Sequence, residues 1–212
     1  MAISIYKKLT YYQKDIRELH IPSQIGFYTF SNIITTRGIK FGNNGLDIPE
    51  GYIIFRTLDD KVISYLRLGV MENPFLLIKD VKYKITAIHS IPKQDILSSD
   101  INFKSISPVL VRNFENRKMY ISDEREIQQN LNLVLNYQIK TYFGIDNPNI
   151  AVSNISSRKK TVRISSNGKK ESITSGFNLS GKIIGSPEII SLLYYRGLGS
   201  KTSLGLGCWE VE

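Results

Sequence analysis

The sequence predicts an α+β protein made of two tandem ferredoxin-like domains, residues 1–98 and 107–212, the first of which lacks its first strand. Three observations support this prediction. The second half shows the order strand, helix, two strands, helix and strand, which is the ferredoxin-like order. The first half shows the same order from its first helix onwards. The 212 residues, 42% of them hydrophobic, are also sufficient to give each domain a core.

Helix-forming residues dominate the start of the chain. Apolar residues recur at helical spacing between Ile5 and Leu19. Thr10, with Gln13 three residues later, has the pattern of a capping box, in which two side chains satisfy free amides at a helix start. We therefore expect two short helices that meet near Leu9.

The rest of the first half is predicted to be mainly strand. Residues 26–34 and 51–57 are rich in aromatic and β-branched side chains, and the Gly-Asn-Asn-Gly sequence at 42–45 is typical of a hairpin turn between them. Asp59 is expected to cap a helix that follows. Alternation over residues 75–91 predicts further strand, with His89 as a structural histidine on its apolar side.

The second half is predicted to begin with short strands at 109–111 and 119–121, followed by a long helix. Ser122 is the expected N-cap of that helix and Gly144 its end. Its buried side is expected to consist of five apolar residues at helical spacing, namely Ile127, Leu131, Val134, Leu135 and Ile139.

The remaining elements complete the ferredoxin-like order. Strands are predicted at 151–155 and 161–165, then a turn at 166–168 and a strand that buries Phe177, Leu179 and Ile183. Ser186 followed by Pro187 predicts the start of a helix that stops at Gly197. A last strand is expected over 206–211.

The composition indicates a polyanionic partner. Lys and Arg number 28 against 19 Asp and Glu, which gives a net charge of +9 and favours nucleic acid or an anionic membrane, although a generic basic surface would look the same.

Cys208 is the only cysteine, so an intramolecular disulfide and a cysteine zinc cluster are excluded and a reducing compartment is favoured. No apolar run reaches the roughly 20 residues needed to span a bilayer. We expect a cytoplasmic protein that does not enter the membrane.

A glycine-rich stretch near the C-terminus is the most informative feature. Residues 197–207, GLGSKTSLGLG, place two Gly-apolar-Gly triplets around a polar centre that contains Lys201. This pattern indicates a loop whose main-chain amides lie open toward an anion, with Lys201 at its crest. Alternatively, Gly197 ends a helix and Gly205 and Gly207 permit a tight entry into a strand. A dinucleotide fingerprint or a Walker loop does not fit, because the loop follows a helix and lacks the Gly-Lys-Ser/Thr order.

Together with its neighbours, this loop resembles a known family. GLGSKTSLGLG, the preceding SGFNLSGKIIGSPEIISLLYYR and the terminal CWEV closely resemble the C-terminal signature of the CRISPR-associated repeat-cleaving endoribonucleases of the RAMP superfamily. AISIYKKL, IRELH and GFYTFSNI resemble the N-terminal part of the same family, so that the resemblance covers nearly the whole chain. It implies two tandem ferredoxin-like domains, in agreement with the order of elements above.

The resemblance also implies an activity. Members of the family cleave CRISPR precursor RNA within its repeats, without metal or another cofactor, by attack of a 2′-hydroxyl on the adjacent phosphate. The products carry a cyclic phosphate and a 5′-hydroxyl. CRISPR repeat RNA is the expected partner; a CRISPR effector complex or a second copy of the chain is a further candidate. The rival hypothesis is a catalytically inactive RNA-binding subunit of such a complex.

By the same resemblance, His20 is the expected catalytic histidine and can serve as general acid or base. Tyr6 is its expected partner, with a core tyrosine as the alternative. Tyr28 is a second candidate phenol, for which a place on a strand face is preferred. The family often has a lysine shortly after the histidine, whereas here no basic residue precedes Arg37, so Arg37 or Lys40 would have to supply the charge.

The expected RNA-binding residues fall into two groups. The first is the glycine loop, through Gly197, Gly199, Ser200, Lys201, Thr202, Ser203, Gly205 and Gly207. The second is a basic hairpin with Arg158, Lys159, Lys160, Arg163, Lys169 and Lys170. Cationic side chains of this kind contact the phosphate backbone and set affinity rather than sequence preference. The alternative for the hairpin is a solvated charged face.

Overall fold

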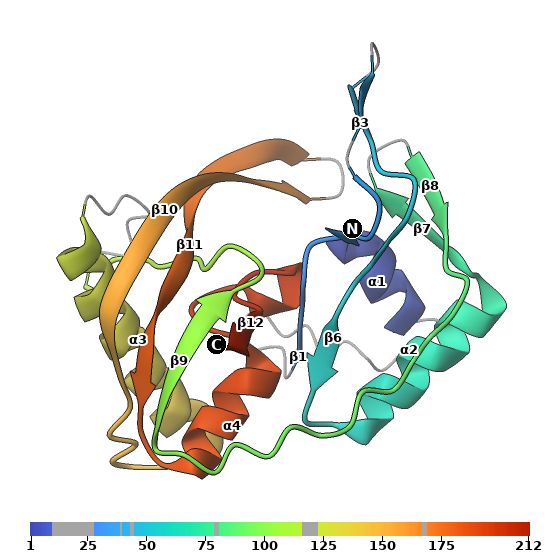
Figure 1. The fold of residues 1–212 in the computed structure, drawn as a ribbon. Coiled ribbons are helices and arrows are strands. Elements are labelled where there is room, and N and C mark those ends of the chain that lie inside the picture. Colours follow the sequence, from blue (N-terminus) through green and yellow to red (C-terminus); the bar gives the residue numbers. More distant parts are fainter. Residues whose placement is uncertain (10–27, 39, 43–44, 79–80, 116–122, 167–168) are drawn as a thin grey trace.

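The structure is a computed structural model that describes residues 1–9, 28–38, 40–42, 45–78, 81–115, 123–166 and 169–212. It has two α+β halves, which lie side by side in Figure 1. In the described part of the chain, none of the helices combines the length and apolarity needed to cross a membrane.

The C-terminal half is a complete ferredoxin-like unit. Its single antiparallel sheet has the strand order β10-β11-β9-β12, in which the first and third strands in sequence are the central pair. Two helices connect these strands, as the predicted order requires. The elements are β9 (Asp100–Ser105), α3 (Glu124–Phe143), β10 (Ala151–Ser166), β11 (Lys169–Ile184), α4 (Pro187–Arg196) and β12 (Trp209–Val211).

The first strand of this sheet lies before residue 107, where the domain was expected to start. Strand β9 alternates buried and exposed side chains, with Ile101 and Phe103 in the core. The expected strand at 109–111 is wrong: its only pairing there is a single bridge from Val109 to Phe177. All three of these residues are buried because they pass beneath the glycine loop. Residues 119–121 lie outside the described part.

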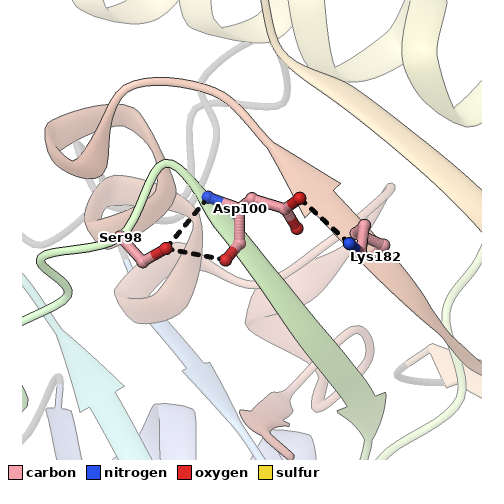
Figure 2. Close-up of polar contacts among 3 residues, drawn as sticks. All are labelled: Ser98, Asp100 and Lys182. Carbon is pink, nitrogen blue, oxygen red and sulfur yellow. Dashed lines mark hydrogen bonds and ion pairs between the residues drawn. The ribbon is translucent and has the colours of Figure 1, made fainter.

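Polar contacts fix the point where the connecting segment enters β9 (Figure 2). Ser98 Oγ donates to the Asp100 carbonyl at 2.7 Å and accepts from the Asp100 amide at 3.2 Å. Asp100 also pairs with Lys182 of β11 at 2.9 Å. The ion pair is partly exposed, so it contributes little stability, but it joins the ends of two adjacent strands.

The two helices of this half end as the sequence predicts, with one correction. Asp123 caps α3, since its side chain accepts from the Glu126 amide at 2.8 Å. The expected cap, Ser122, lies outside the described residues. Gly144 ends the helix in the left-handed conformation. Ser186 caps α4 with Pro187 at its first position, as predicted.

The buried side of α3 is the predicted one, and all five expected residues of that side are buried. They pack with the inward residues of the sheet and with α4 in one core, to which Trp209 contributes the largest side chain. The predicted strands at 151–155 and 161–165 are one strand, β10, with an irregularity where Asn154 adopts φ 50°. Beyond the sheet, β10 and β11 continue as a two-stranded ribbon that arches toward the N-terminal half (Figure 1).

The N-terminal half has the predicted helix, strand, strand, helix, strand order and begins with a helix. After α1 (Ala2–Leu9), an irregular hairpin is formed by β1 (Tyr28–Phe30), β2 (Ile34–Thr35), β3 (Lys40–Gly42), β4 (Gly45–Asp47), β5 (Gly51–Tyr52) and β6 (Phe55–Thr57). The two strands predicted before and after the Gly-Asn-Asn-Gly sequence are therefore confirmed as the two sides of this hairpin. The second expected N-terminal helix lies outside the described residues.

Asp59 caps α2 (Asp60–Glu72) as predicted, because its side chain accepts from the Lys61 amide at 2.8 Å. The expected strand at 75–91 is instead a short hairpin of β7 (Phe75–Ile78) and β8 (Val81–Lys84), followed by a segment without regular structure. His89 lies in that segment and is exposed, so the prediction of a structural histidine on an apolar strand face is wrong.

Candidate nucleic-acid interface

The glycine loop lies between the two halves of the molecule. Its 3-10 turn, Thr202–Leu204, lies beside both α1 and β1. Thr29 Oγ1 of β1 donates to the Leu206 carbonyl at 3.1 Å. A Cβ added to Gly205 would come within 2.4 Å of the Phe30 ring, so this glycine permits the close approach of β1. The fold thus brings residues from the two ends of the sequence together.

The neck of the loop is closed by backbone contacts that require glycine at Gly207. The Leu198 amide donates to the Gly207 carbonyl at 2.8 Å. Gly207 itself has φ 70°, and a Cβ there would lie 1.9 Å from the Leu198 carbonyl oxygen. Part of the glycine pattern is therefore explained by packing, as the alternative interpretation proposed.

Two amides of the glycine loop are engaged by the segment beneath it, so the expected row of open amides does not extend along the whole loop. The amides of Ser200 and Gly207 donate to the Leu110 and Pro108 carbonyls at 2.9 Å each, which fixes the loop on segment 107–111. Within the described part of the chain, no main-chain bond outside the turn is donated by the amides of residues 201–203. The amides of residues 201–203, at the crest of the loop, are therefore candidates for contact with an anion.

Lys201 is at that crest, exposed, with φ 57°. Partial burial lowers the pKa of its ammonium group, and the nearby Arg112 charge lowers it further. The charge of Arg112 therefore acts on the ammonium group of Lys201. Such an arrangement favours binding of an anion, because an anion would relieve the mutual repulsion.

Lys201 lines an open hollow of about 380 Å³ whose other wall is the ribbon of β10 and β11. The ribbon contributes Thr161, Ile164 and residues 172–175. The crest of the glycine loop and the ribbon that carries the basic residues therefore border one hollow, to which the ribbon itself contributes uncharged side chains.

Two of the ribbon cations lie on the face of the ribbon that carries Thr161 and Ile173. Lys159 is opposite the buried Phe177, and Arg163 is opposite Ile173, which lines the hollow. Because side chains alternate along a strand, Arg158 and Lys160 belong to the other face. Lys169 and Lys170 are in β11, but their side chains lie outside the described part.

Arg56 of β6 connects the two halves next to the loop. Its guanidinium carbon lies 3.8 Å from the centroid of the Tyr194 ring, and Nη1 donates to the Trp209 carbonyl and contacts Cys208 Sγ at 3.7 Å. Burial raises the pKa of the Cys208 thiol to about 11. This contact was not predicted from the sequence, although a single charge within the apolar strand sequence GYIIFRT is a signal of such a partner.

The principal catalytic candidates are only partly visible. His20 lies outside the described residues. Tyr6 belongs to α1, which contacts the 3-10 turn of the glycine loop, but its side chain is not described. Tyr28 is 1% exposed and stacks on Phe55 at 5.3 Å, so its position agrees with the strand-face interpretation.

The two cations expected to supply positive charge, Arg37 and Lys40, belong to the N-terminal half. Arg37 pairs with Glu50 at 3.2 Å, and both side chains are largely exposed. Lys40 is in β3, with its side chain outside the described part. Arg112 was not predicted, since it follows the apolar run 109–111 and only the fold brings it to Lys201.

Among the described residues, His, Cys, Asp and Glu form no group of three or more that could hold a metal ion.

This architecture, two ferredoxin-like halves with a glycine-rich loop between them, is shared with solved structures that match the chain over its full length. The model of the family described as CRISPR associated protein Cas6, C-terminal, matches residues 91–211, which is more than half of the chain. The chain belongs to this Cas6 family.

Individual relatives agree with that assignment. A CRISPR-associated endoribonuclease-like protein Cas6 from Pyrococcus furiosus is 27% identical over 201 residues, which cover 90% of this chain and 81% of that protein. The solved structure of a Cas6-related gene product from the same organism matches all of this chain and 88% of its own, with a TM-score of 0.81 and 24% identity. A RAMP protein described as binding different RNA substrates also matches all of this chain and 89% of its own, with a TM-score of 0.81 and 22% identity.

Proposed function

We propose that this protein is a metal-independent endoribonuclease that processes CRISPR precursor RNA in the cytoplasm by cutting within its repeats. The observation that best supports this is the position of the glycine loop, whose cationic crest lies beside the helix that carries Tyr6. A phosphate bound at Lys201 would then lie between the basic ribbon and the N-terminal half. Membership of the Cas6 family supports the choice of RNA.

The proposed chemistry is attack of a ribose 2′-hydroxyl on the adjacent phosphate. One group takes the 2′-proton and another protonates the leaving 5′-oxygen, so that the products carry a cyclic phosphate and a 5′-hydroxyl. His20 serves as general acid or base, because a histidine exchanges protons near neutral pH, and Tyr6 is its partner. Positive charge at the crest stabilises the negative charge that develops on the phosphate.

The chain contains two histidines, which gives a matched test of this proposal. Cleavage of a cognate repeat RNA in the presence of EDTA is expected to fall at least about a hundredfold in His20→Ala, the usual minimum for loss of a general acid or base. His89→Ala is the control, since His89 is exposed in the segment between β8 and β9, and it is expected to cleave at the wild-type rate. Undiminished cleavage by His20→Ala would remove this histidine from the mechanism, and loss of all cleavage in EDTA would contradict metal independence.

Phosphate contact by Lys201 predicts a specific salt dependence. Lys201→Ala is expected to weaken binding of the repeat RNA and to reduce the slope of log affinity against log salt by about 0.7, the value for one contact to a single strand. Lys61→Ala, which removes an exposed lysine of α2, is the control and is expected to leave the slope unchanged. Filter binding at several salt concentrations measures both. An unchanged slope in Lys201→Ala would show that this lysine contacts no phosphate.

A second candidate function is a catalytically inactive RNA-binding subunit of a CRISPR effector complex. The observation that favours it is the missing basic residue between His20 and Arg37, together with the ion pair that engages Arg37 with Glu50. This function predicts tight, salt-sensitive repeat binding without any cleavage product.

Sedimentation of the protein with and without repeat RNA also tests for a homodimer.

A further inference from the structure

An exposed aromatic pair lies on the outer side of α3, outside the hollow at Lys201. Phe114 and Tyr137 are 38% and 53% exposed, and their ring centroids are 5.7 Å apart at an interplanar angle of 68°. Leu133, one turn before Tyr137, is exposed as well. Because the rings meet edge to face, each leaves π surface open to solvent.

The position of Phe114 is fixed by a buried polar side chain. Asn130 of α3 is 7% exposed, and its Oδ1 accepts from the Phe114 amide at 2.7 Å. Its Nδ2 donates to the Glu126 carbonyl at 2.9 Å, which holds the amide group in this orientation. The aromatic pair is therefore prepared before any ligand binds, which lowers the entropic cost of binding.

The pair is continuous with the glycine loop through both of the elements that carry it. Gln138, next to Tyr137, donates to the Gly199 carbonyl at 3.3 Å. Leu110, four residues before Phe114, accepts from the Ser200 amide. The segment between β9 and α3 thus passes from the glycine loop to the aromatic pair, and in the view of Figure 1 it crosses the β10–β11 ribbon.

The segment that leads from the glycine loop to the rings also carries a cation. Arg112 is half-buried, two residues before Phe114, and close enough for its charge to act on Lys201. Its Nε is buried without a hydrogen-bond partner among the described residues. Lys201 and Arg112 supply positive charge and the two rings supply aromatic faces, the combination with which proteins hold single strands.

We propose that Phe114 and Tyr137 form a stacking platform for unpaired bases of the bound RNA, beyond the phosphates held at Lys201 and Arg112. This inference rests on the proposed RNA-binding function but not on cleavage. The occupant is single-stranded RNA, because only unpaired bases present a free π face. The net charge of +9 and the adjacent cations favour a polyanion over a protein partner here.

Binding of a single-stranded oligoadenylate to the full chain tests the platform without any cleavage. Phe114→Ala and Tyr137→Ala are each expected to weaken binding about tenfold, which corresponds to about 1.4 kcal/mol. The slope of log affinity against log salt is expected to stay at the wild-type value, because no phosphate contact is lost. Tyr137→Phe keeps the ring and is expected to bind as the wild type does.

Phe75→Ala is the matched control, since Phe75 of β7 is 36% exposed and lies on the other half of the molecule. It is expected to leave binding unchanged.

Tyr137→Trp gives a positive signal. The fluorescence of the new indole is expected to be quenched by the oligoadenylate, while the native Trp209 is buried and insensitive. Thermal unfolding of each variant separates loss of a stacking contact from loss of the fold.

Wild-type affinity in both alanine variants would overturn the proposal. It would also be overturned if the wild type failed to bind oligoadenylate, because base stacking tolerates any base. Self-association that Phe114→Ala and Tyr137→Ala abolish, with RNA affinity unchanged, would show that the pair is a protein contact instead. The cleavage assay with repeat RNA in EDTA tests the proposed cleavage separately, so the failure of that proposal and the failure of this one are distinguishable.

Discussion

Replacing Gly207 by alanine is expected to destabilise the fold by about 4 kcal/mol or more, a loss reserved for changes that break close packing or force a strained backbone. Both conditions apply at this position. The added Cβ would lie 1.9 Å from the Leu198 carbonyl oxygen, and φ is 70°. Because backbone atoms lie on both sides of the contact, no side-chain rotation can relieve it. Denaturant unfolding followed by circular dichroism measures the loss.

Gly144→Ala is the control that separates conformation from contact. Gly144 has φ 69°, almost the value of Gly207, but a Cβ there would meet nothing within 4 Å. Its replacement is expected to cost only about 1–2 kcal/mol, the penalty for an L-residue in the left-handed region. Equal losses in the two variants would mean that the neck of the glycine loop opens easily, and would contradict the packing explanation of the motif.

Replacing Arg56 by methionine is expected to destabilise the contact between the two halves by about 3 kcal/mol, from the loss of a partly buried cation–π contact and a charge-assisted hydrogen bond. The variant leaves the Tyr194 ring and the Trp209 carbonyl without their shared partner. The aliphatic part of methionine fills much of the space, so the effect is mainly electrostatic. The glycine loop, which packs between the halves, is expected to open with the contact.

Cys208 provides the readout for that opening. It is fully buried, and burial raises the pKa of its thiol to about 11, so a thiol reagent is expected to label it only when the halves separate. Arg56→Met is therefore expected to be labelled faster than the wild type. Arg67→Met, which removes an exposed arginine of α2, is expected to be labelled at the wild-type rate. Equal labelling of all three proteins would show that Arg56 does not hold the halves together.

Local signals in the sequence were sufficient for the helices. The N-caps Asp59 and Ser186, the end at Gly144 and the buried side of α3 were all predicted correctly, since each depends on residues within a few turns of one another. The order of elements then predicted the ferredoxin-like topology, which the sheet order of the C-terminal half confirms. The comparisons agree with the family resemblance read from the glycine loop and its neighbours.

Two strand predictions failed because an apolar run carries no sign of its neighbours. Residues 109–111 are continuously apolar and were taken as a strand, but they are buried on all sides beneath the glycine loop and make one bridge. Strand β9 shows clear alternation of Ile101 and Phe103 with polar residues, which is the local pattern of a half-buried strand. Alternation over 75–91 likewise continued past the end of its hairpin partner.

By itself, the sequence determined the α+β class, the starts of α2 and α4, the family and the identity of the cationic and glycine-rich segments, because caps, periodicity and motifs are encoded in neighbouring residues. Only the tertiary structure decided which of these segments meet. Lys201 shares a hollow with the β10–β11 ribbon, Arg112 lies close enough for its charge to act on Lys201, and the glycine loop lies beside α1. These contacts join residues far apart along the chain, so they depend on how the two halves pack, which no local pattern records.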